Sequence, residues 1–232
     1  TPLYSSAASD VIRDSWYPDT DLGEVPHDIY TFERPNWHAA VGREHNAARG
    51  AAVLFDQTSF GKFVLKGPDA EAALNWIAAN DMSKPVGSLI YTQMLNDQGG
   101  IECDLTCVRI AEDEYYIITG TGFVTHDFDH ISRNIPVGMH AQLVDVTSAY
   151  AVLSLFGPNA RLILQEITGD DISNDALPFG AAKTIGIAGC PVRALRVSYV
   201  GELGWELHLP VEYAVTVCLL YTSPSPRDVE EA

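Results

Sequence analysis

Positive charge is scarce in this sequence of 232 residues. Only 14 Lys and Arg residues stand against 31 Asp and Glu residues, which gives a formal net charge of −17 at pH 7. A surface of this sign repels the phosphates of nucleic acids and the headgroups of anionic membranes. We therefore expect no nucleic-acid partner and no membrane partner. The charge would suit a cationic substrate, but it identifies none.

Long apolar runs and several well-known catalytic motifs are absent as well. No apolar run approaches the roughly 18 residues that a membrane-spanning helix needs. The sequence contains no P-loop and no G-x-S-x-G motif. The nearest approach to a dinucleotide-binding motif is GTG at 120–122, which lacks a third glycine and is followed by Phe123. The sequence therefore predicts no dinucleotide site within this chain.

Metal-ligating residues are few and scattered. The sequence has four cysteines but no C-x-x-C motif. We expect the cysteines to be small core residues of a protein in a reducing compartment, and not to form disulfides. His126 and His130 in THDFDH have helical i, i+4 spacing, but no third ligand follows at a recognisable distance. A solvated helix face explains this pair better, so no metal site is predicted. The cysteines are Cys103, Cys107, Cys190 and Cys218.

What the sequence does contain is enough apolar material for a core, with many turns. Hydrophobic residues make up 47% of it, and there are 18 Gly and 13 Pro residues. Helical spacing and alternating patterns are mixed along the chain, which predicts an α+β fold. The expected helices are 35–49, 67–81 and 123–135. The expected strands lie within 56–67, 91–106, 114–122 and 192–210.

One segment of the sequence recurs. GPDAEAALNWIAANDMS at 67–83 and GPNARLILQEITGDDIS at 157–173 share seven of 17 residues at an offset of 90. The same offset places Tyr115 on Trp205 and Ile117 on Leu207. Chance would explain part of this, because Gly-Pro is common at helix starts. We prefer a duplicated α+β unit, whose two copies would meet at a cleft suited to a ligand.

Two predicted hairpins carry carboxylates on their polar faces. In YTQMLNDQGGIECDLT at 91–106, alternation sends Glu102, Asp104 and Thr106 to one face. Ile101, Cys103, Leu105 and the following Cys107 go to the other face. In VRALRVSYVGELGWELHLP at 192–210, a turn at GELG leads to a strand on which Glu206 and His208 share a face. Alternation leaves open whether these polar faces meet solvent or line the cleft.

These two hairpins resemble the signatures of the folate-binding aminomethyltransferase family. That family includes the T-protein of glycine cleavage and the C-terminal halves of dimethylglycine and sarcosine dehydrogenases. The segments TPLY, RPNWHAAVGREHNAAR, DQTSFGKF and TGTGFVTHDFDHI resemble the flavin-linked dehydrogenase branch more than free-standing T-protein. The resemblance covers about residues 1–217, with its motifs in the family's order.

The resemblance implies a fold, a site and cofactors. The fold is the family's two pseudo-duplicated units of antiparallel sheet plus helices. Tyr91, Tyr199 and Glu206 match the family's folate-binding positions, and Asp104 matches its catalytic aspartate. The family's further basic residue lies downstream of the matched part. Tetrahydrofolate is the expected cofactor, and FAD is expected only in an N-terminal domain that this sequence lacks.

The same resemblance implies a reaction and its alternatives. We expect the domain to take a one-carbon unit, as an iminium or aminomethyl carbon, from dimethylglycine or sarcosine and yield 5,10-methylenetetrahydrofolate. A flavin-binding half would be its partner, and the domain alone could be inactive. A stand-alone aminomethyltransferase, a folate-dependent demethylase and a non-catalytic folate-binding regulator are the alternatives. The compartment would be the bacterial cytoplasm or the mitochondrial matrix.

Four segments are expected along the chain. Residues 1–45 would form a lead-in segment, 46–150 the first folate-binding unit and 151–217 a second, incomplete unit. The string CLLYTSPSPRD at 218–228 matches nothing in the family, so 218–232 is expected to be a non-native tail. Because the sequence starts at Thr1 without a signal segment, we expect that start to be an internal cut.

Overall fold

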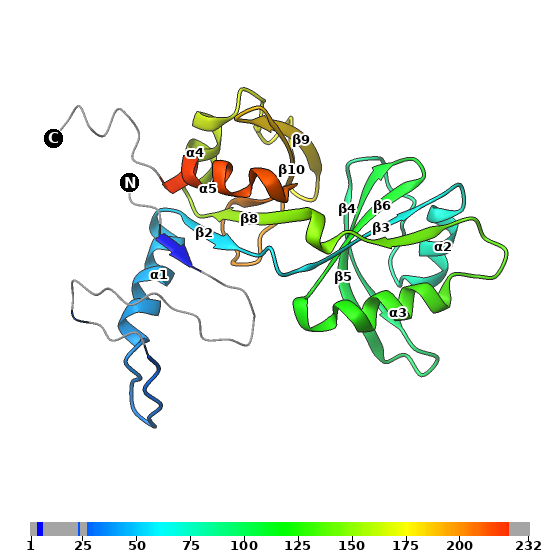
Figure 1. Cartoon of the computed structure of the whole chain (residues 1–232), viewed down its shortest axis with the longest axis horizontal. Helices are drawn as coiled ribbons and strands as arrows, with labels where there is room; N and C mark the ends of the chain where they lie inside the picture. Colours follow the sequence, from blue (N-terminus) through cyan, green and yellow to red (C-terminus); the bar gives the residue numbers. More distant parts are fainter. Residues whose placement is uncertain (1–3, 7–22, 24–26, 223–232) are drawn as a thin grey trace.

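Two sheets lie side by side in the computed structural model, each covered by its own helices (Figure 1). The structure describes residues 4–6, 23 and 27–222. In the described part both sheets are antiparallel except for one parallel pair, β1 with β2. The predicted α+β class is therefore confirmed.

The sheet on the right of Figure 1 has the strand order β4-β5-β6-β3-β7. Helices α2 (Ala70–Ile77) and α3 (Val124–Asn134) contribute Leu74 and Ile131 to its core. A short 3-10 helix at Thr121–Phe123 precedes α3. Its strands are β3 (Gly61–Lys66), β4 (Leu89–Leu95), β5 (Ile101–Ala111), β6 (Glu114–Thr119) and β7 (Gln142–Asp145).

The other sheet has the order β1-β2-β8-β11-β10-β9. Helices α4 (Ala160–Ile167) and α5 (Ala214–Thr222) pack on it through Leu164 and Val217. Helix α1 (His38–Gly50) lies before β2, and short 3-10 helices occupy Thr147–Ala149 and Val211–Tyr213. The strands are β1 (Tyr4–Ser6), β2 (Val53–Asp56), β8 (Tyr150–Phe156), β9 (Ala182–Ile187), β10 (Cys190–Leu195) and β11 (Gly204–Pro210).

The predicted duplication is present in space. Helices α2 and α4 start at Ala70 and Ala160, and strands β6 and β11 start at Glu114 and Gly204, so both pairs keep the offset of 90. The order β4-β5-β6-β3 in one sheet matches β9-β10-β11-β8 in the other. Each unit is thus a hairpin and two further strands under a helix.

The two units exchange a strand. Strand β2 precedes β3 in the chain but pairs with β8, and β7 precedes β8 but pairs with β3. Equivalent bonds close both connections: Gln57 N donates to Val152 O at 2.9 Å, and Val146 N donates to Lys62 O at 2.8 Å. Each sheet therefore contains one strand that comes directly before the other unit in the sequence. The backbone hydrogen bonds of these two strands hold the units together.

Two predicted elements are shorter than expected. Helix α2 was predicted over 67–81 but ends at Ile77, because Ala78 is extended and forms a β-bridge with Met94. Its buried stripe of Ala70, Ala73 and Leu74 fits the predicted periodicity.

The second hairpin also differs from its prediction. Strand β10 ends at Leu195 and β11 starts at Gly204, so 196–203 is a loop rather than strand and tight turn. The alternation on β11 is confirmed, because Trp205, Leu207 and Leu209 are all buried in one core. In the first hairpin Ile101 departs from its predicted face: it is 65% exposed beside a register shift in the β4–β5 pairing.

The segment boundaries predicted at residues 45, 150 and 217 stay predictions. Helix α5 runs on through Cys218 to Thr222, and 223–232 lie outside the described residues. None of the four cysteines forms a disulfide within the described part of the chain. Cys103, Cys107 and Cys190 are buried, as expected of core residues, and Cys218 is half-buried.

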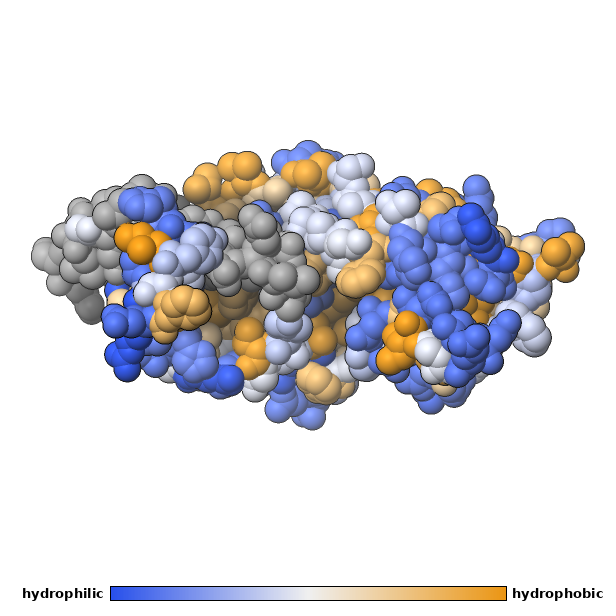
Figure 2. Space-filling model, turned by 90° about the horizontal axis from the view of Figure 1, so that it is seen from below, coloured by the Kyte–Doolittle hydropathy of each residue, from blue (hydrophilic) through white to orange (hydrophobic). Residues whose placement is uncertain are grey.

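The surface mixes polar and apolar side chains. Figure 2 shows hydrophilic residues dominating the half that carries the β4-β5-β6-β3-β7 sheet, with apolar groups in small separate patches. Among the described residues, no helix combines the length and apolarity that crossing a membrane requires.

Candidate functional site

A cavity of about 720 Å³ lies between the two sheets. Ligand pockets commonly measure about 300–1,000 Å³, so its size suits a cofactor-sized molecule. Its walls come from β4, β5, β6, α3, the 196–203 loop and β11. All four residues predicted for the site line it: Tyr91, Asp104, Tyr199 and Glu206.

The first hairpin supplies one side of this cavity. In the β4–β5 pairing Tyr91 lies opposite Thr106, and Gln93 lies opposite Asp104, so the four side chains share a face. Gln93 Nε2 donates a hydrogen bond to Asp104 Oδ1 at 3.0 Å. A hydrogen bond with Asp104 also raises the pKa of the Tyr91 phenol. Asp104 is exposed to the cavity, and Tyr91 stays protonated beside it.

The second sheet supplies the other carboxylate. The Glu206 side chain is only 12% exposed and faces the cavity from β11. Its Oε2 lies 3.5 Å from Nε2 of His208, which is fully buried. His208 Nδ1 in turn lies 3.0 Å from the hydroxyl of buried Tyr116 on β6. This contact crosses from one sheet to the other.

Tyr199 reaches the cavity from the 196–203 loop. The residue is 67% exposed, which leaves the ring accessible to pack against a ligand. The loop is tied to helix α1 by an ion pair in which Arg49 Nη1 lies 2.8 Å from Glu202 Oε1. Tyr199 was expected to lie within the second hairpin, but it lies in the loop between β10 and β11. Its role in binding stays a prediction.

Sequence reasoning missed Asp127 on α3, which is buried and lines the cavity. It accepts hydrogen bonds from Thr119 Oγ1 and, at 2.9 Å, from His126 Nδ1. The bond to Asp127 raises the pKa of His126. A carboxylate in the first turn of a helix is common, because the helix dipole stabilises it there, so its position alone does not indicate a functional role. The available signal was its position four residues before Ile131, which places both on the buried face.

The same region brings together three groups of metal-ligand type. Atoms of Cys103, His126 and Asp127 lie within 4.8 Å of one another. Cys103 comes from β5, which is why spacing around THDFDH did not show it. Burial raises the pKa of the Cys103 thiol and disfavours the thiolate that would bind a metal. The hydrogen bonds of Asp127 explain this cluster, and the expectation of no metal site stays a prediction.

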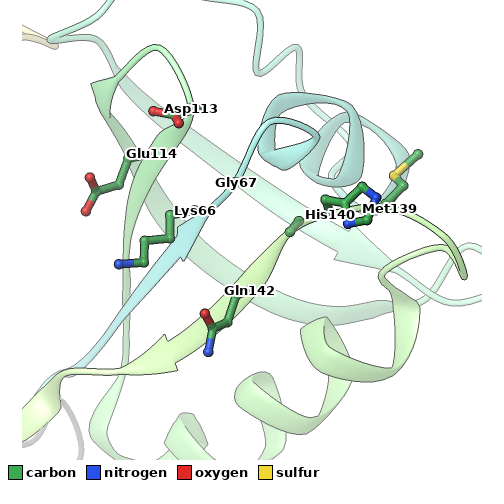
Figure 3. Close-up of a pocket in the computed structure, with 8 residues that line it drawn as sticks. Lys66, Gly67, Asp113, Glu114, Met139, His140 and Gln142 are labelled. Carbon is green, nitrogen blue, oxygen red and sulfur yellow. The ribbon is translucent and has the colours of Figure 1, made fainter.

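A second hollow, of about 510 Å³, lies where β3 ends and where β6 and β7 begin (Figure 3). The side chains of Lys66 and Glu114 point away from those of Met139 and His140 rather than converging on one point. None of the predicted site residues lines it. The inter-sheet cavity is therefore the stronger candidate site.

The inter-sheet cavity can hold a flat, partly polar ligand. Apolar and aromatic groups such as Phe60, Leu105 and Phe123 form part of its wall. Four carboxylates line it, Glu102, Asp104, Asp127 and Glu206, of which Glu206 comes from the other sheet. Ionised carboxylates accept strong hydrogen bonds from N–H groups. Such a site suits a nitrogen heterocycle that presents N–H donors at its edge.

Comparison with known proteins agrees with this geometry. The family model for the GCVT N-terminal domain matches residues 13–221, most of the chain. The chain belongs to this family. The predicted membership of the aminomethyltransferase family is thereby confirmed. The predicted similarity to the flavin-linked dehydrogenases is confirmed by the relatives described next.

Two curated relatives illustrate that similarity. Human mitochondrial sarcosine dehydrogenase is 42% identical over 204 residues, which cover 82% of this chain and 22% of that protein. Mouse mitochondrial dimethylglycine dehydrogenase is 36% identical over 205 residues, covering 84% and 24%. This GCVT domain therefore spans less than a quarter of the length of these relatives.

A solved structure supports the fold. The glycine cleavage system aminomethyltransferase T from Bartonella henselae superposes with a TM-score of 0.71 at 26% identity. The match covers 79% of this chain and 49% of that one. The two-unit arrangement described above is thus the aminomethyltransferase fold.

Proposed function

We propose that this GCVT domain binds tetrahydrofolate between its two sheets and accepts a one-carbon unit from a methylated glycine. The observation that carries the proposal is the convergence of Tyr91, Asp104, Tyr199 and Glu206 on one cavity. Dimethylglycine or sarcosine would be oxidised in a separate flavin-binding half, which would also hold the FAD. The similarity to the two mitochondrial dehydrogenases supports this assignment over a stand-alone aminomethyltransferase.

Glu206 would hold the ligand. Its carboxylate is largely buried, so N–H groups at the edge of a pterin would make charge-assisted hydrogen bonds shielded from water. Tyr91 and Tyr199 would pack against the rings, since both are exposed within reach of the cavity. The size of the cavity and these three side chains fit the cofactor.

Asp104 would carry out the proton chemistry. Tetrahydrofolate supplies the nitrogen nucleophiles that take up the one-carbon unit as 5,10-methylenetetrahydrofolate. Protons must move from those nitrogens to the departing amine, and a carboxylate at the cavity surface can accept and return them. The same negative charge stabilises a cationic iminium group nearby. Apolar walls that exclude water would protect this group from hydrolysis to formaldehyde.

The binding step is tested by titrating the chain with tetrahydrofolate in a calorimeter. Tryptophan fluorescence is less direct, because Trp205 is buried on the face of β11 opposite Glu206. We expect one site, and we expect Glu206→Gln to weaken binding about 10- to 100-fold through the loss of a charge-assisted pair. Glu166→Gln, on exposed α4 surface outside the cavity, is the matched control.

A catalytic role is separated from folate binding alone by Asp104→Asn. With the flavin-binding half present, we expect this variant to oxidise the amine normally but to release formaldehyde in place of 5,10-methylenetetrahydrofolate. Unchanged yield of the folate product would instead favour a non-catalytic, folate-binding role.

A further inference from the structure

Behind Glu206 lies a buried hydrogen-bond chain that the proposed chemistry does not use. It runs from Glu206 Oε2 to His208 Nε2 at 3.5 Å, and from His208 Nδ1 to the Tyr116 hydroxyl at 3.0 Å. Both His208 and Tyr116 are buried, with exposures of 1% and 0%. An ordered polar chain in an apolar interior is costly unless each member is satisfied, so its presence calls for a reason.

We propose that His208 is a positioning residue: together with Tyr116 it fixes the Glu206 carboxylate in the orientation that meets the ligand. This inference rests on the proposed function, because it takes Glu206 as the group that holds the pterin. His208 itself does not line the cavity. It acts only through Glu206.

The direction of the chain follows from its donors and acceptors. Neutral histidine carries one N–H, and a carboxylate can only accept. Nε2 must therefore carry the hydrogen and donate to Glu206, which leaves Nδ1 to accept from the Tyr116 hydroxyl. The opposite tautomer would direct a nitrogen lone pair at the carboxylate. Both contacts are satisfied only when tyrosine donates to histidine and histidine donates to glutamate.

The surroundings keep His208 neutral and Tyr116 protonated. Burial lowers the pKa of His208, although Glu206 opposes this effect, and the cationic groups Arg193 and Lys62 lower it further. Burial also raises the pKa of Tyr116. The Arg193 guanidinium lies 4.4 Å from the centre of the Tyr116 ring, and the Tyr150 ring meets that ring edge-on at 5.8 Å. These contacts fix the position of the Tyr116 ring, whose hydroxyl is the first donor in the hydrogen-bond chain.

The consequence for Glu206 is pre-organisation. With Oε2 held from behind, the other carboxylate oxygen is left to accept from a ligand in the cavity. A side chain already fixed in its bound rotamer loses less entropy when a ligand arrives. Ligand binding should therefore weaken when a hydrogen bond between Tyr116, His208 and Glu206 is removed, even though every residue that touches the ligand is intact.

A pair of neighbouring tyrosines provides a matched test. Tyr116→Phe removes the hydroxyl that bonds His208, whereas Tyr115→Phe removes one that bonds Met82 O at 2.9 Å in the core. Both rings are buried on β6, so the two changes should reduce folding stability similarly. We expect Tyr116→Phe to weaken tetrahydrofolate binding about three- to tenfold, and Tyr115→Phe to leave it unchanged. Equal effects of the two variants on binding would overturn the proposal.

A spectroscopic readout needs no ligand. Nitrogen-15 spectra of the histidine side chains should show His208 as the neutral Nε2–H tautomer in the unmodified chain, and as a mixture of tautomers in Tyr116→Phe. A charged ring or the Nδ1–H tautomer would overturn the proposal. If the expected tautomer is seen but tetrahydrofolate does not bind, the proposed function fails while the Tyr116–His208–Glu206 chain stands.

Discussion

Asp104 and Glu206, two of the four carboxylates that line the cavity, lie in different surroundings. Asp104 on β5 is exposed, and its described hydrogen-bond partners come from the neighbouring strand. Glu206 on β11 is 12% exposed and contacts buried His208, which bonds to the other sheet. A carboxylate that must exchange protons gains from access, and one that must hold a ligand gains from a fixed orientation.

The duplication sharpens this contrast. At the offset of 90, Glu206 corresponds to Tyr116, and the two are joined by His208. One copy of the repeated strand thus presents a carboxylate to the cavity, and the other presents a phenol to the interior. Equivalent positions in the two units have taken complementary roles at one site, which a single unit could not provide.

The largest expected effect concerns the equivalent glycines that lie three residues before α2 and α4. Gly67 and Gly157 have φ values of +137° and +128°, and an added Cβ would lie 2.1 Å from His140 O and 2.5 Å from Ala51 O. Strain and overlap together should cost about 3–5 kcal/mol for either Gly→Ala change. Urea unfolding measures this. A loss at only one of the two sites would contradict their equivalence.

Gly138→Ala is the control for these two substitutions. Its φ is +93°, but no atom of the described residues lies within 4 Å of the added Cβ. Only backbone strain remains, and we expect a loss of about 1 kcal/mol.

A smaller effect concerns Lys62, whose counterpart at the offset of 90 is Val152. Both are fully buried, but Lys62 Nζ donates to Thr58 O and Tyr150 O at 2.7 Å each. Burial lowers the pKa of Lys62 to about 8 from 10.5. Between these two values the unfolded chain binds a proton that the folded chain does not, so stability should rise with pH there. The rise is on the order of 3 kcal/mol.

Lys62→Met isolates this contribution from other groups that titrate in the same range. Stability is measured by urea unfolding at several pH values for the variant and the unmodified chain. The difference between them should change from pH 8 to 10.5 and stay constant below pH 8. Parallel curves across the whole range would show that Lys62 keeps an ordinary pKa.

The smallest effect concerns the Arg49–Glu202 ion pair, which ties the 196–203 loop to α1. Both side chains are partly exposed, at 49% and 25%, and exposed pairs contribute about 0.2–1 kcal/mol. Arg49→Met should lower stability by no more than this. Because the loop carries Tyr199, we expect a measurable drop in tetrahydrofolate affinity as well. An unchanged affinity in calorimetry would show that the loop needs no such anchor.

Periodicity and the internal repeat predicted much of the fold. The offset of 90 identified the paired helices. Alternation placed Asp104 and Glu206 on the polar faces of their strands, and only the family resemblance assigned them to a site. The exchange of β2 and β7 between the units was not predictable, because pairing of distant strands depends on registers that local patterns do not encode. The burial of His208 was missed for a related reason: alternation shows a shared face, but not what covers that face.

The central claim is that Glu206 binds and Asp104 reacts, and one comparison tests it most directly. Tetrahydrofolate is titrated calorimetrically into Glu206→Gln and Asp104→Asn under identical conditions. We predict that Glu206→Gln loses about 10- to 100-fold in affinity. Asp104→Asn should bind within about threefold of the unmodified chain, because its exposed carboxylate contributes little net binding energy. Equal losses in the two variants, or a greater loss in Asp104→Asn, would contradict the division of roles.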